Sequence, residues 1–207
     1  MNPPIIHNCQ QGSEEWMALR LGRPTASELC NLLTPEFKAK TGETPAKYLA
    51  EKVAEKWRGQ LNPGFSSWAT NQGTLREPSA LAWYEFAHNV GIHSVGFVQM
   101  AEEDFGCSPD GLIGDDCGIE IKCPEPPQHV RYVIEGKVPK DYIVQVHASM
   151  YATGRPRWVF MSYHPDFPKL VIEVKRDSEI QEKICKQLAV FYGEFAHAMN
   201  KLRELDK

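Results

Sequence analysis

The stretch CSPDGLIGDDCGIEIKCP, at positions 107–124, constrains the fold more than any other part of the chain. Two runs of apolar and glycine residues flank the pair Asp115–Asp116, which is typical of two strands joined by a turn. Apolar and charged residues alternate in the second run, so Glu120 and Lys122 lie on one face of the predicted strand. Because the turn brings Asp110 beside Glu120, the sequence predicts two carboxylates and a lysine on one patch.

The order of helices and strands around this hairpin predicts the fold class. With no internal repeat and no linker, the order favours a single α/β domain over residues 1–207, with a central mixed β-sheet flanked by helices. Thr44 and Ser178 are the expected N-caps of two of the helices. Apolar periodicity and capping residues indicate helices at 13–22, 44–57, 68–88, 139–152 and 178–204. A further short helix is expected to begin after a cap at Thr25 or Ser27. Further strands are expected at 93–100, 105–114, 157–164 and 170–177.

Length and composition are those of an ordinary globular protein. The 207 residues are enough for one domain with a hydrophobic core. The longest apolar runs are too short to span a bilayer, and the N-terminus lacks the basic and apolar segments of a signal peptide. No pair of the six cysteines has C-x-x-C spacing, which argues against a zinc site. We therefore expect a cytoplasmic protein with no membrane contact.

The net charge of the chain is 23 minus 27, or −4, which by itself argues against a nucleic-acid-binding protein. Bulk charge is a poor guide where the site itself is acidic, because carboxylates that hold metal ions count as negative until the ions bind. Local basic residues, such as Arg20 and Arg23 around Gly22, matter more. Nucleic acid therefore stays among the candidate ligands.

The predicted patch of Asp110, Glu120 and Lys122 has the chemistry of a magnesium site. Hard divalent cations prefer carboxylate and carbonyl oxygens and keep several waters. One or two such ions can activate a water and stabilise the leaving oxygen in phosphodiester cleavage. A nearby lysine can stabilise the developing charge or help to deprotonate the attacking water. The structural alternative is a surface hairpin with a Glu/Lys pair on its solvent face. The S-P-D-G segment and the apolar register on the opposite face favour the site.

SPDG followed by GIEIKCP resembles the PD-(D/E)xK nuclease signature. The chain as a whole resembles the phage lambda exonuclease family, also called YqaJ-type viral recombinases. The segments WMALRLGRPTASE at 16–28, NQGTLREPSALAWYE at 71–85 and IVQVHASMYATG at 143–154 resemble further motifs of that family, in the family's order. The resemblance implies a restriction-endonuclease-like core around the central sheet.

The resemblance implies a metal site at the hairpin. Asp110 and Glu120 match the family's metal-binding aspartate and glutamate, and the backbone carbonyl of Ile121 matches a further ligand. Lys122 matches the catalytic lysine, and Gln145 matches a glutamine that helps to hold that lysine or the attacking water. The implied metal is Mg²⁺, as one or two ions, with Mn²⁺ as a substitute.

Glu77 completes the acidic cluster that the resemblance implies. It matches the acidic residue on a helix of the family. Without the resemblance, Glu77 reads as an exposed helix acid next to Pro78, and Gln145 reads as an ordinary polar residue at the edge of the core. Both alternatives stay open at the level of sequence.

The resemblance also implies a pocket for the 5′-phosphate of DNA. Arg20 matches the arginine that grips this phosphate, and Ser27 and Ser108 match small hydroxyl residues of the same pocket. An arginine offers a two-pronged donor that fits a phosphate group. The structural alternatives are a solvated helix end for Arg20 and a plain N-cap for Ser27.

One position departs from the family. After the lysine, the lambda-type enzyme carries a basic residue that also reaches the phosphate, but here the stretch reads CPEPPQHVRY. Either His129 or Arg131 is expected to take over this contact. Trp68, in a loop rich in glycine, proline and serine, is a further candidate for contact with DNA or with another subunit.

The implied activity is a Mg²⁺-dependent exonuclease that processively degrades one strand of linear double-stranded DNA from a phosphorylated 5′ end. It releases mononucleotides and leaves 3′ single-stranded tails, which a single-strand annealing protein uses in recombination. The implied assembly is a homotrimeric ring, encoded by a phage or prophage and present in the bacterial host cytoplasm. The alternatives are a PD-(D/E)xK endonuclease and a catalytically silent module that binds DNA ends.

Overall fold

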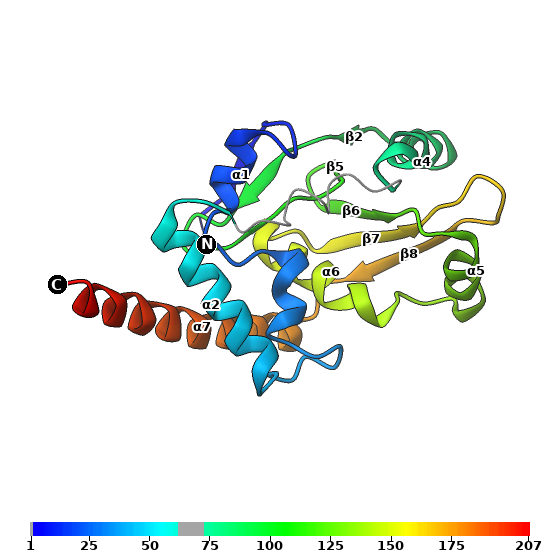
Figure 1. The fold of residues 1–207 in the computed structure, drawn as a ribbon. Coiled ribbons are helices and arrows are strands. Elements are labelled where there is room, and N and C mark those ends of the chain that lie inside the picture. The colour runs from blue at the N-terminus through cyan, green and yellow to red at the C-terminus, as the bar shows by residue number, and fades with distance from the viewer. Residues whose placement is uncertain (1, 62–72) are drawn as a thin grey trace.

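The computed structural model describes residues 2–61 and 73–207 of the chain. Its centre is a five-stranded sheet with the spatial order β2 (Ile92–His93), β5 (Gly111–Ile113), β6 (Cys117–Lys122), β7 (Arg157–Ser162) and β8 (Leu170–Lys175). Strands β6 and β7 run parallel, and the other neighbouring pairs are antiparallel. Helices flank this mixed sheet (Figure 1), which confirms the predicted fold class.

A smaller antiparallel sheet lies beside the central one. It has the order β1 (Ile5–His7), β3 (Phe97–Gln99), β4 (Gly106–Cys107). The strands predicted at 93–100 and 105–114 were wrong as single elements, because each is divided between the two sheets. The chain bends within both segments and crosses from one sheet to the other, and this crossing depends on tertiary contacts that apolar patterning does not encode.

The helices lie on both faces of the central sheet (Figure 1). Helix α4 contacts β6 on one face, and α6 contacts β7 on the other. The helical segments of the described residues are α1 (Glu14–Arg20), the 3₁₀ helix η1 (Ala26–Asn31), α2 (Glu43–Arg58), α4 (Gly73–His88), α5 (Pro126–Glu135), α6 (Lys140–Thr153) and α7 (Ser178–Leu205).

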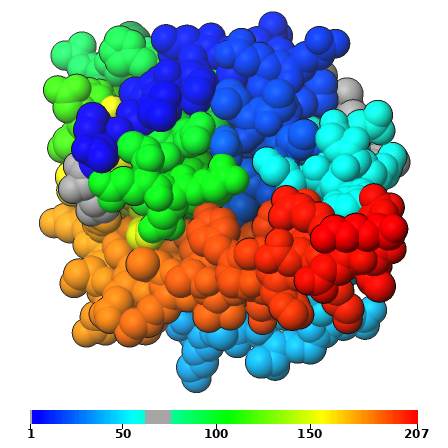
Figure 2. All heavy atoms as spheres, turned by 90° about the vertical axis from the view of Figure 1, so that its left-hand side faces the viewer, coloured from blue at the N-terminus to red at the C-terminus, as the bar shows by residue number. Residues whose placement is uncertain are grey.

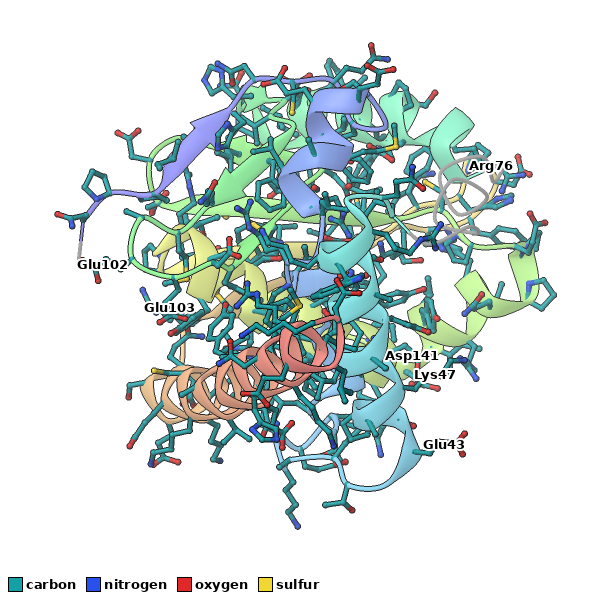
Figure 3. All side chains as sticks on the ribbon, turned by 60° about the vertical axis from the view of Figure 1, so that its left-hand side comes forward. Glu43, Lys47, Arg76, Glu102, Glu103 and Asp141 are labelled. Carbon is teal, nitrogen blue, oxygen red and sulfur yellow. The ribbon has the colours of Figure 1, made fainter. Side chains whose placement is uncertain are left out.

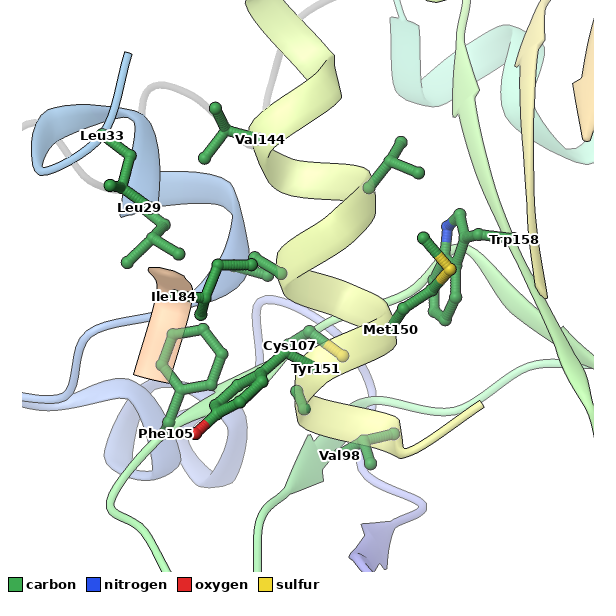
Figure 4. Packing of buried hydrophobic residues seen from close by; sticks show 14 of the residues in the cluster. Leu29, Leu33, Val98, Phe105, Cys107, Val144, Met150, Tyr151, Trp158 and Ile184 are labelled. Carbon is green, nitrogen blue, oxygen red and sulfur yellow. The ribbon is translucent and has the colours of Figure 1, made fainter. Parts of the chain in front are cut away.

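Alternating residues of β7 build the two hydrophobic cores. Trp158 and Phe160 belong to the larger cluster on the α6 side, where Trp158 lies beside Met150 of α6 (Figure 4). Val159 belongs to the smaller cluster on the α4 side. Gly118 of β6 pairs with Trp158, and a Cβ at Gly118 would lie 2.3 Å from the indole ring. The close approach of the Trp158 ring to the backbone of β6 therefore requires glycine at position 118.

Two helix starts differ from the predictions, and one helix was not predicted. Asp177 caps α7 in place of Ser178, because its carboxylate accepts hydrogen bonds from two backbone N–H groups of the first turn. Gly42 is the N-cap of α2, so that helix begins before Thr44. Helix α5 was not predicted, although Pro126 at its first position is a signal for a helix start.

The long C-terminal helix α7 contacts α2 and α6. Figure 2 shows α7, in orange to red, running across the face of the molecule on which the N-terminal segments also lie. Its buried side chains include Ile184, Leu188 and Phe191, which join the larger core. No helix in the described part of the chain is long and apolar enough to cross a membrane.

Candidate active site

The β5–β6 hairpin brings two carboxylates together. Asp110 directly precedes β5, and Gly111 pairs with Ile119, so Asp110 lies opposite Glu120. The Asp110 carboxylate accepts a hydrogen bond of 2.5 Å from the backbone N–H of Ile121. The Glu120 side chain is only 2% exposed. This burial contradicts the alternative of a solvent-facing Glu/Lys pair on a surface hairpin.

Lys122 follows on the same face of β6 and contacts Glu120. Its Nζ donates to Glu120 Oε1 at 2.5 Å and lies 5.2 Å from the centre of the Tyr142 ring. Burial lowers the pKa of Lys122, but the Glu120 and Asp110 carboxylates outweigh that effect and hold the pKa above its usual range. The lysine is therefore a cation at neutral pH in this arrangement.

Glu77 of α4 lines the same cleft and adds a third carboxylate to the cluster. Burial and the neighbouring Glu120 carboxylate raise the pKa of Glu77. Burial and the same neighbour also raise the pKa of Asp110 well above its usual value. The single cation Lys122 lowers both pKa values without offsetting these effects. Burial, together with repulsion between the carboxylates, therefore outweighs the attraction of the lysine in this cluster.

The donor set fits a hard divalent cation. Glu120 Oε2 is buried and has no hydrogen-bond partner, an arrangement that costs free energy unless a cation or a donor reaches the oxygen. Asp110 and Ile121 line the same cleft. The carboxylate of the one and the backbone carbonyl of the other are candidates for further oxygen ligands. Within the described ranges, no three His, Cys, Asp or Glu side chains form a ready-made cage. Mg²⁺ does not need one, because it uses one or two carboxylates and keeps several waters.

Arg20, the last residue of α1, forms a second polar cluster in the cleft. Its side chain is 6% exposed, and its guanidinium lies over the Trp16 ring at 4.6 Å. Its two terminal nitrogens donate to three hydroxyls, those of Ser108 at 3.4 Å, Thr25 at 3.1 Å and Ser27 at 3.5 Å. The alternative of a solvated helix end for Arg20 is therefore wrong.

The hydroxyl of Ser108 is oriented as a donor by its neighbours. It accepts one hydrogen bond from the Trp16 indole N–H at 2.7 Å and a longer one from Arg20. A serine hydroxyl has two acceptor sites and one donor, so these contacts leave its own O–H to donate. The N-cap of η1 is Thr25 and not Ser27, so the alternative of a plain N-cap for Ser27 is wrong. Together the three side chains form a cluster of donors that suits an anion.

One cleft of about 750 Å³ contains both clusters. Of the described residues that line it, nine were predicted for the site: Arg20, Ser27, Glu77, Ser108, Asp110, Glu120, Ile121, Lys122 and Gln145. Gln145 reaches the cleft from α6, which carries the segment at 143–154. Residues that are more than 120 positions apart in the sequence thus share one concave surface.

A family model described as the YqaJ-like viral recombinase domain matches residues 15–156, more than half of the chain. The chain belongs to this recombinase family. The match spans α1, the β5–β6 hairpin and α6, and therefore every residue predicted for the cleft. A comparison with curated protein sequences gives no match.

Solved structures of exonucleases resemble this member of the recombinase family. LHK-Exo, an alkaline exonuclease from Laribacter hongkongensis, is 30% identical with a TM-score of 0.77, and the match covers 93% of this chain and 100% of that one. The same exonuclease in complex with dAMP is 31% identical with a TM-score of 0.78, at the same coverage. A phage-related exonuclease from Haemophilus somnus 129PT has a TM-score of 0.67 at 12% identity, covers 87% of this chain and 96% of its own, and shares the fold.

Neither residue expected to replace the family's second basic contact lines the cleft among the described residues. His129 is fully buried, with Nε2 3.0 Å from the Pro168 carbonyl and Nδ1 2.8 Å from the Ser162 hydroxyl. Because a carbonyl can only accept, His129 carries its proton on Nε2 and holds β7 to the following loop. Arg131 is exposed and lies 3.9 Å from Glu135. Helix α5 thus places His129 in the core and Arg131 on the surface, and neither side chain lines the described part of the cleft.

Several side chains near the site were not predicted. Arg76 directly precedes Glu77 on α4 (Figure 3), and its Nη1 is buried with no hydrogen-bond partner. Its charge lowers the pKa of the Cys123 thiol, although burial and the Glu77 carboxylate prevail and raise that pKa to about 11. Trp16 also lines the cleft, where its indole N–H donates to the Ser108 hydroxyl. Trp68 lies outside the described residues.

Proposed function

We propose that this recombinase-family member is a Mg²⁺-dependent exonuclease that degrades one strand of linear double-stranded DNA from a phosphorylated 5′ end to mononucleotides. The observation that carries the proposal is the single cleft, which contains a carboxylate–lysine cluster and a separate cluster of anion donors. A metal-binding group and a phosphate-binding group in one cleft suit the cleavage of a phosphodiester next to a terminal phosphate. The likeness to an alkaline exonuclease, and to its complex with dAMP, supports the same chemistry.

Asp110, Glu120 and the Ile121 carbonyl would hold the metal, with Glu77 adding negative potential to the cluster. One or two bound Mg²⁺ ions supply an activated water and stabilise the leaving oxygen, and Mn²⁺ would substitute. The buried Glu120 Oε2 is the strongest support for this assignment. The hydrogen bond from the Ile121 N–H to Asp110 positions this carboxylate beside Glu120.

Lys122 would act directly at the scissile phosphate. The lysine is held by Glu120 and lies over the Tyr142 ring, so its ammonium has a defined position at the cleft. A positioned cation stabilises negative charge that develops on phosphate oxygens. The proposed role is therefore stabilisation of that charge, with help in deprotonating the attacking water as the alternative. Gln145, which also lines the cleft, would orient that water.

Arg20, Ser27 and Ser108 would bind the terminal 5′-phosphate. All three present hydrogen-bond donors, and the guanidinium adds a positive charge that is largely shielded from solvent. A phosphate held there would limit how far the DNA end advances past the metal site. The bond that is cut would then be the first phosphodiester, which releases one mononucleotide and leaves a new 5′-phosphate for the next cycle.

Continued digestion leaves a 3′ single-stranded tail, for which a single-strand annealing protein is the proposed recipient. A net charge of −4 gives little nonspecific attraction to DNA. Processive action would therefore need enclosure of the duplex, and a homotrimeric ring is the proposed assembly. The proposed location is the bacterial host cytoplasm, where a phage-encoded recombinase would meet linear DNA.

The test uses linear duplex DNA that carries a phosphate on one 5′ end and a hydroxyl on the other. Wild type is compared with Lys122→Ala in Mg²⁺, and released nucleotides are assigned to each end. Mononucleotides from the phosphorylated end, absent with Lys122→Ala, are expected. Cleavage at internal positions would instead support an endonuclease, and end binding without cleavage by either protein would support a silent end-binding module.

A further inference from the structure

Buried charges of alternating sign form a network behind the proposed phosphate pocket. Arg20 Nη2 lies 4.0 Å from Glu28 Oε2, Lys52 Nζ lies 3.0 Å from Glu28 Oε1, and Lys52 Nζ lies 3.2 Å from Glu55 Oε2. The side chains of Lys52 and Glu55 are 3% and 4% exposed. Glu55 is tied to the turn after α1, because its Oε2 accepts the backbone N–H of Gly22 at 3.2 Å.

The three outer members of this network do not meet a ligand in the cleft. Glu28, Lys52 and Glu55 are not among the described residues that line it, whereas Arg20 is. Lys52 and Glu55 come from α2, which packs against η1 and the C-terminal helix α7. Two charges from a helix that contributes no residue to the described cleft lining therefore act on the site indirectly, through Glu28 and through the turn that follows α1.

Every oxygen of the Glu28 carboxylate is engaged by a donor other than Arg20. Oε1 accepts from Lys52, and Oε2 accepts from the hydroxyls of Thr25 at 2.8 Å and Tyr48 at 3.4 Å. An arginine and a carboxylate with no such competitors form a two-pronged pair at about 2.8 Å. That pair would use the same planar N–H donors that a phosphate uses. Here the carboxylate stands at 4.0 Å from the guanidinium, at the edge of ion-pair contact.

We propose that Lys52 is a positioning residue for 5′-end recognition: by holding Glu28, it prevents this carboxylate from closing on Arg20 and competing with phosphate. The inference rests on the proposed role of Arg20 in binding a terminal 5′-phosphate. Glu55 supports the arrangement by fixing Lys52 against the Gly22 turn. Lys52 itself does not touch DNA. The discrimination between phosphorylated and hydroxyl ends is therefore controlled from α2.

The test measures binding and not cleavage. Two hairpin duplexes, alike except for a 5′-phosphate or a 5′-hydroxyl, are titrated with each variant in EDTA, and fluorescence anisotropy gives the ratio of the two dissociation constants. The main variant is Lys52→Met/Glu55→Gln, which removes one charge of each sign and keeps the buried network neutral. The rescue variant adds Glu28→Gln, which removes the competing carboxylate. Lys186→Met/Glu182→Gln, at an exposed pair 2.7 Å apart on α7, is the matched control.

The wild-type ratio is expected to favour the phosphorylated end. In the double variant, the ratio of the two dissociation constants is expected to fall about tenfold. This change corresponds to the loss of one charge-assisted hydrogen bond. The triple variant is expected to recover it, because no carboxylate is left to pair with Arg20, and the α7 control is expected to keep the wild-type ratio. A purely structural role for Lys52 would not be rescued by a third substitution.

Three results would overturn the proposal: a double variant with the wild-type ratio, a triple variant that recovers nothing, or a wild-type ratio near one. Thermal unfolding of each variant is recorded in parallel. If the double variant does not fold, Lys52→Gln serves in its place. It keeps a donor beside Glu28 without the charge, so a smaller loss in the same direction is expected, and an unchanged ratio contradicts the proposal. If wild type releases no nucleotides but still prefers the phosphorylated end, the proposed nuclease activity is refuted and the proposed role of Lys52 is not.

Discussion

Lys122 Nζ lies 2.5 Å from Glu120 Oε1, and this pair sits where a metal site and a reacting phosphate are proposed to meet. The other oxygen of the same carboxylate is buried without a partner. One carboxylate thus orients the lysine with one oxygen and, in the proposed site, offers its second oxygen to the metal. Glu120 connects the proposed metal site to the proposed catalytic cation.

Replacement of Lys122 by alanine is expected to lower nucleotide release by about 100-fold or more, because it removes a positioned cation from the scissile phosphate. Release is measured from phosphorylated linear duplex in saturating Mg²⁺. Lys140→Ala, at an exposed lysine of α6, is the control and is expected to keep wild-type rates. A loss of less than about threefold in Lys122→Ala would contradict a role in the chemical step.

Glu120→Gln is expected to weaken metal binding by roughly two orders of magnitude, since affinity for hard cations depends on the number of ligand charges. Titration calorimetry with Mn²⁺ in the absence of DNA measures this directly, without reference to activity. The control is Glu194→Gln at an exposed position of α7. Equal Mn²⁺ affinity in wild type and Glu120→Gln would place the metal elsewhere.

Metal-dependent stabilisation is expected to grow as pH rises. The pKa values of Asp110 and Glu77 are raised in the folded protein, so without metal it holds these protons more tightly than the unfolded chain. The free energy of unfolding of the metal-free protein therefore falls as pH rises from the ordinary carboxyl pKa of about 4 through the raised values. Mg²⁺ is expected to bind the deprotonated carboxylates and to reverse this loss.

The measurement for this prediction is the shift in Tm on addition of Mg²⁺, recorded from about pH 5 to about pH 8. The shift should increase with pH in the wild type and be much smaller in Asp110→Asn, which has no proton to release at this position. A shift of constant size across this pH range would show that the carboxylates do not bind the metal in competition with protons.

The basic contact to a terminal phosphate is expected to come from Arg20 and not from α5. Arg20→Lys should reduce the preference for a phosphorylated 5′ end by about tenfold, because lysine cannot form a two-pronged contact. Arg131→Ala should leave this preference unchanged, since Arg131 is exposed and pairs with Glu135. Competition between phosphorylated and hydroxyl ends measures the preference of both variants. A loss of preference in Arg131→Ala but not in Arg20→Lys would assign the phosphate contact to Arg131.

Gly118→Ala is expected to destabilise the protein by about 1–3 kcal/mol, because the new methyl group would overlap the Trp158 ring. Gly193→Ala is the matched control: this glycine lies in α7, a Cβ added to it would meet no atom within 4 Å, and the change should stabilise by about 0.5–1 kcal/mol. Urea unfolding measures both. Equal stability of Gly118→Ala and wild type would mean that the β6–β7 pair can move apart.

Local sequence was sufficient for the hairpin and for the placement of its charged side chains. Alternation in β6 placed Glu120 and Lys122 on one face, and the turn at 115–116 placed Asp110 beside them. These relationships depend on strand periodicity and on a short turn, both of which are local properties of the chain. The order of helices and strands likewise led to the mixed sheet, because the elements are separated by clear capping and turn signals.

Tertiary structure alone decided which distant groups meet. The crossing between the two sheets divided two predicted strands, and helix α5 turned His129 into the core and Arg131 to solvent. The network of Glu28, Lys52 and Glu55 joins α2 to η1 through contacts 24 residues apart in sequence. Sequence determined the local geometry of the carboxylates and the lysine. Burial, which depends on how whole elements pack, decided their electrostatics and the surroundings of Arg20.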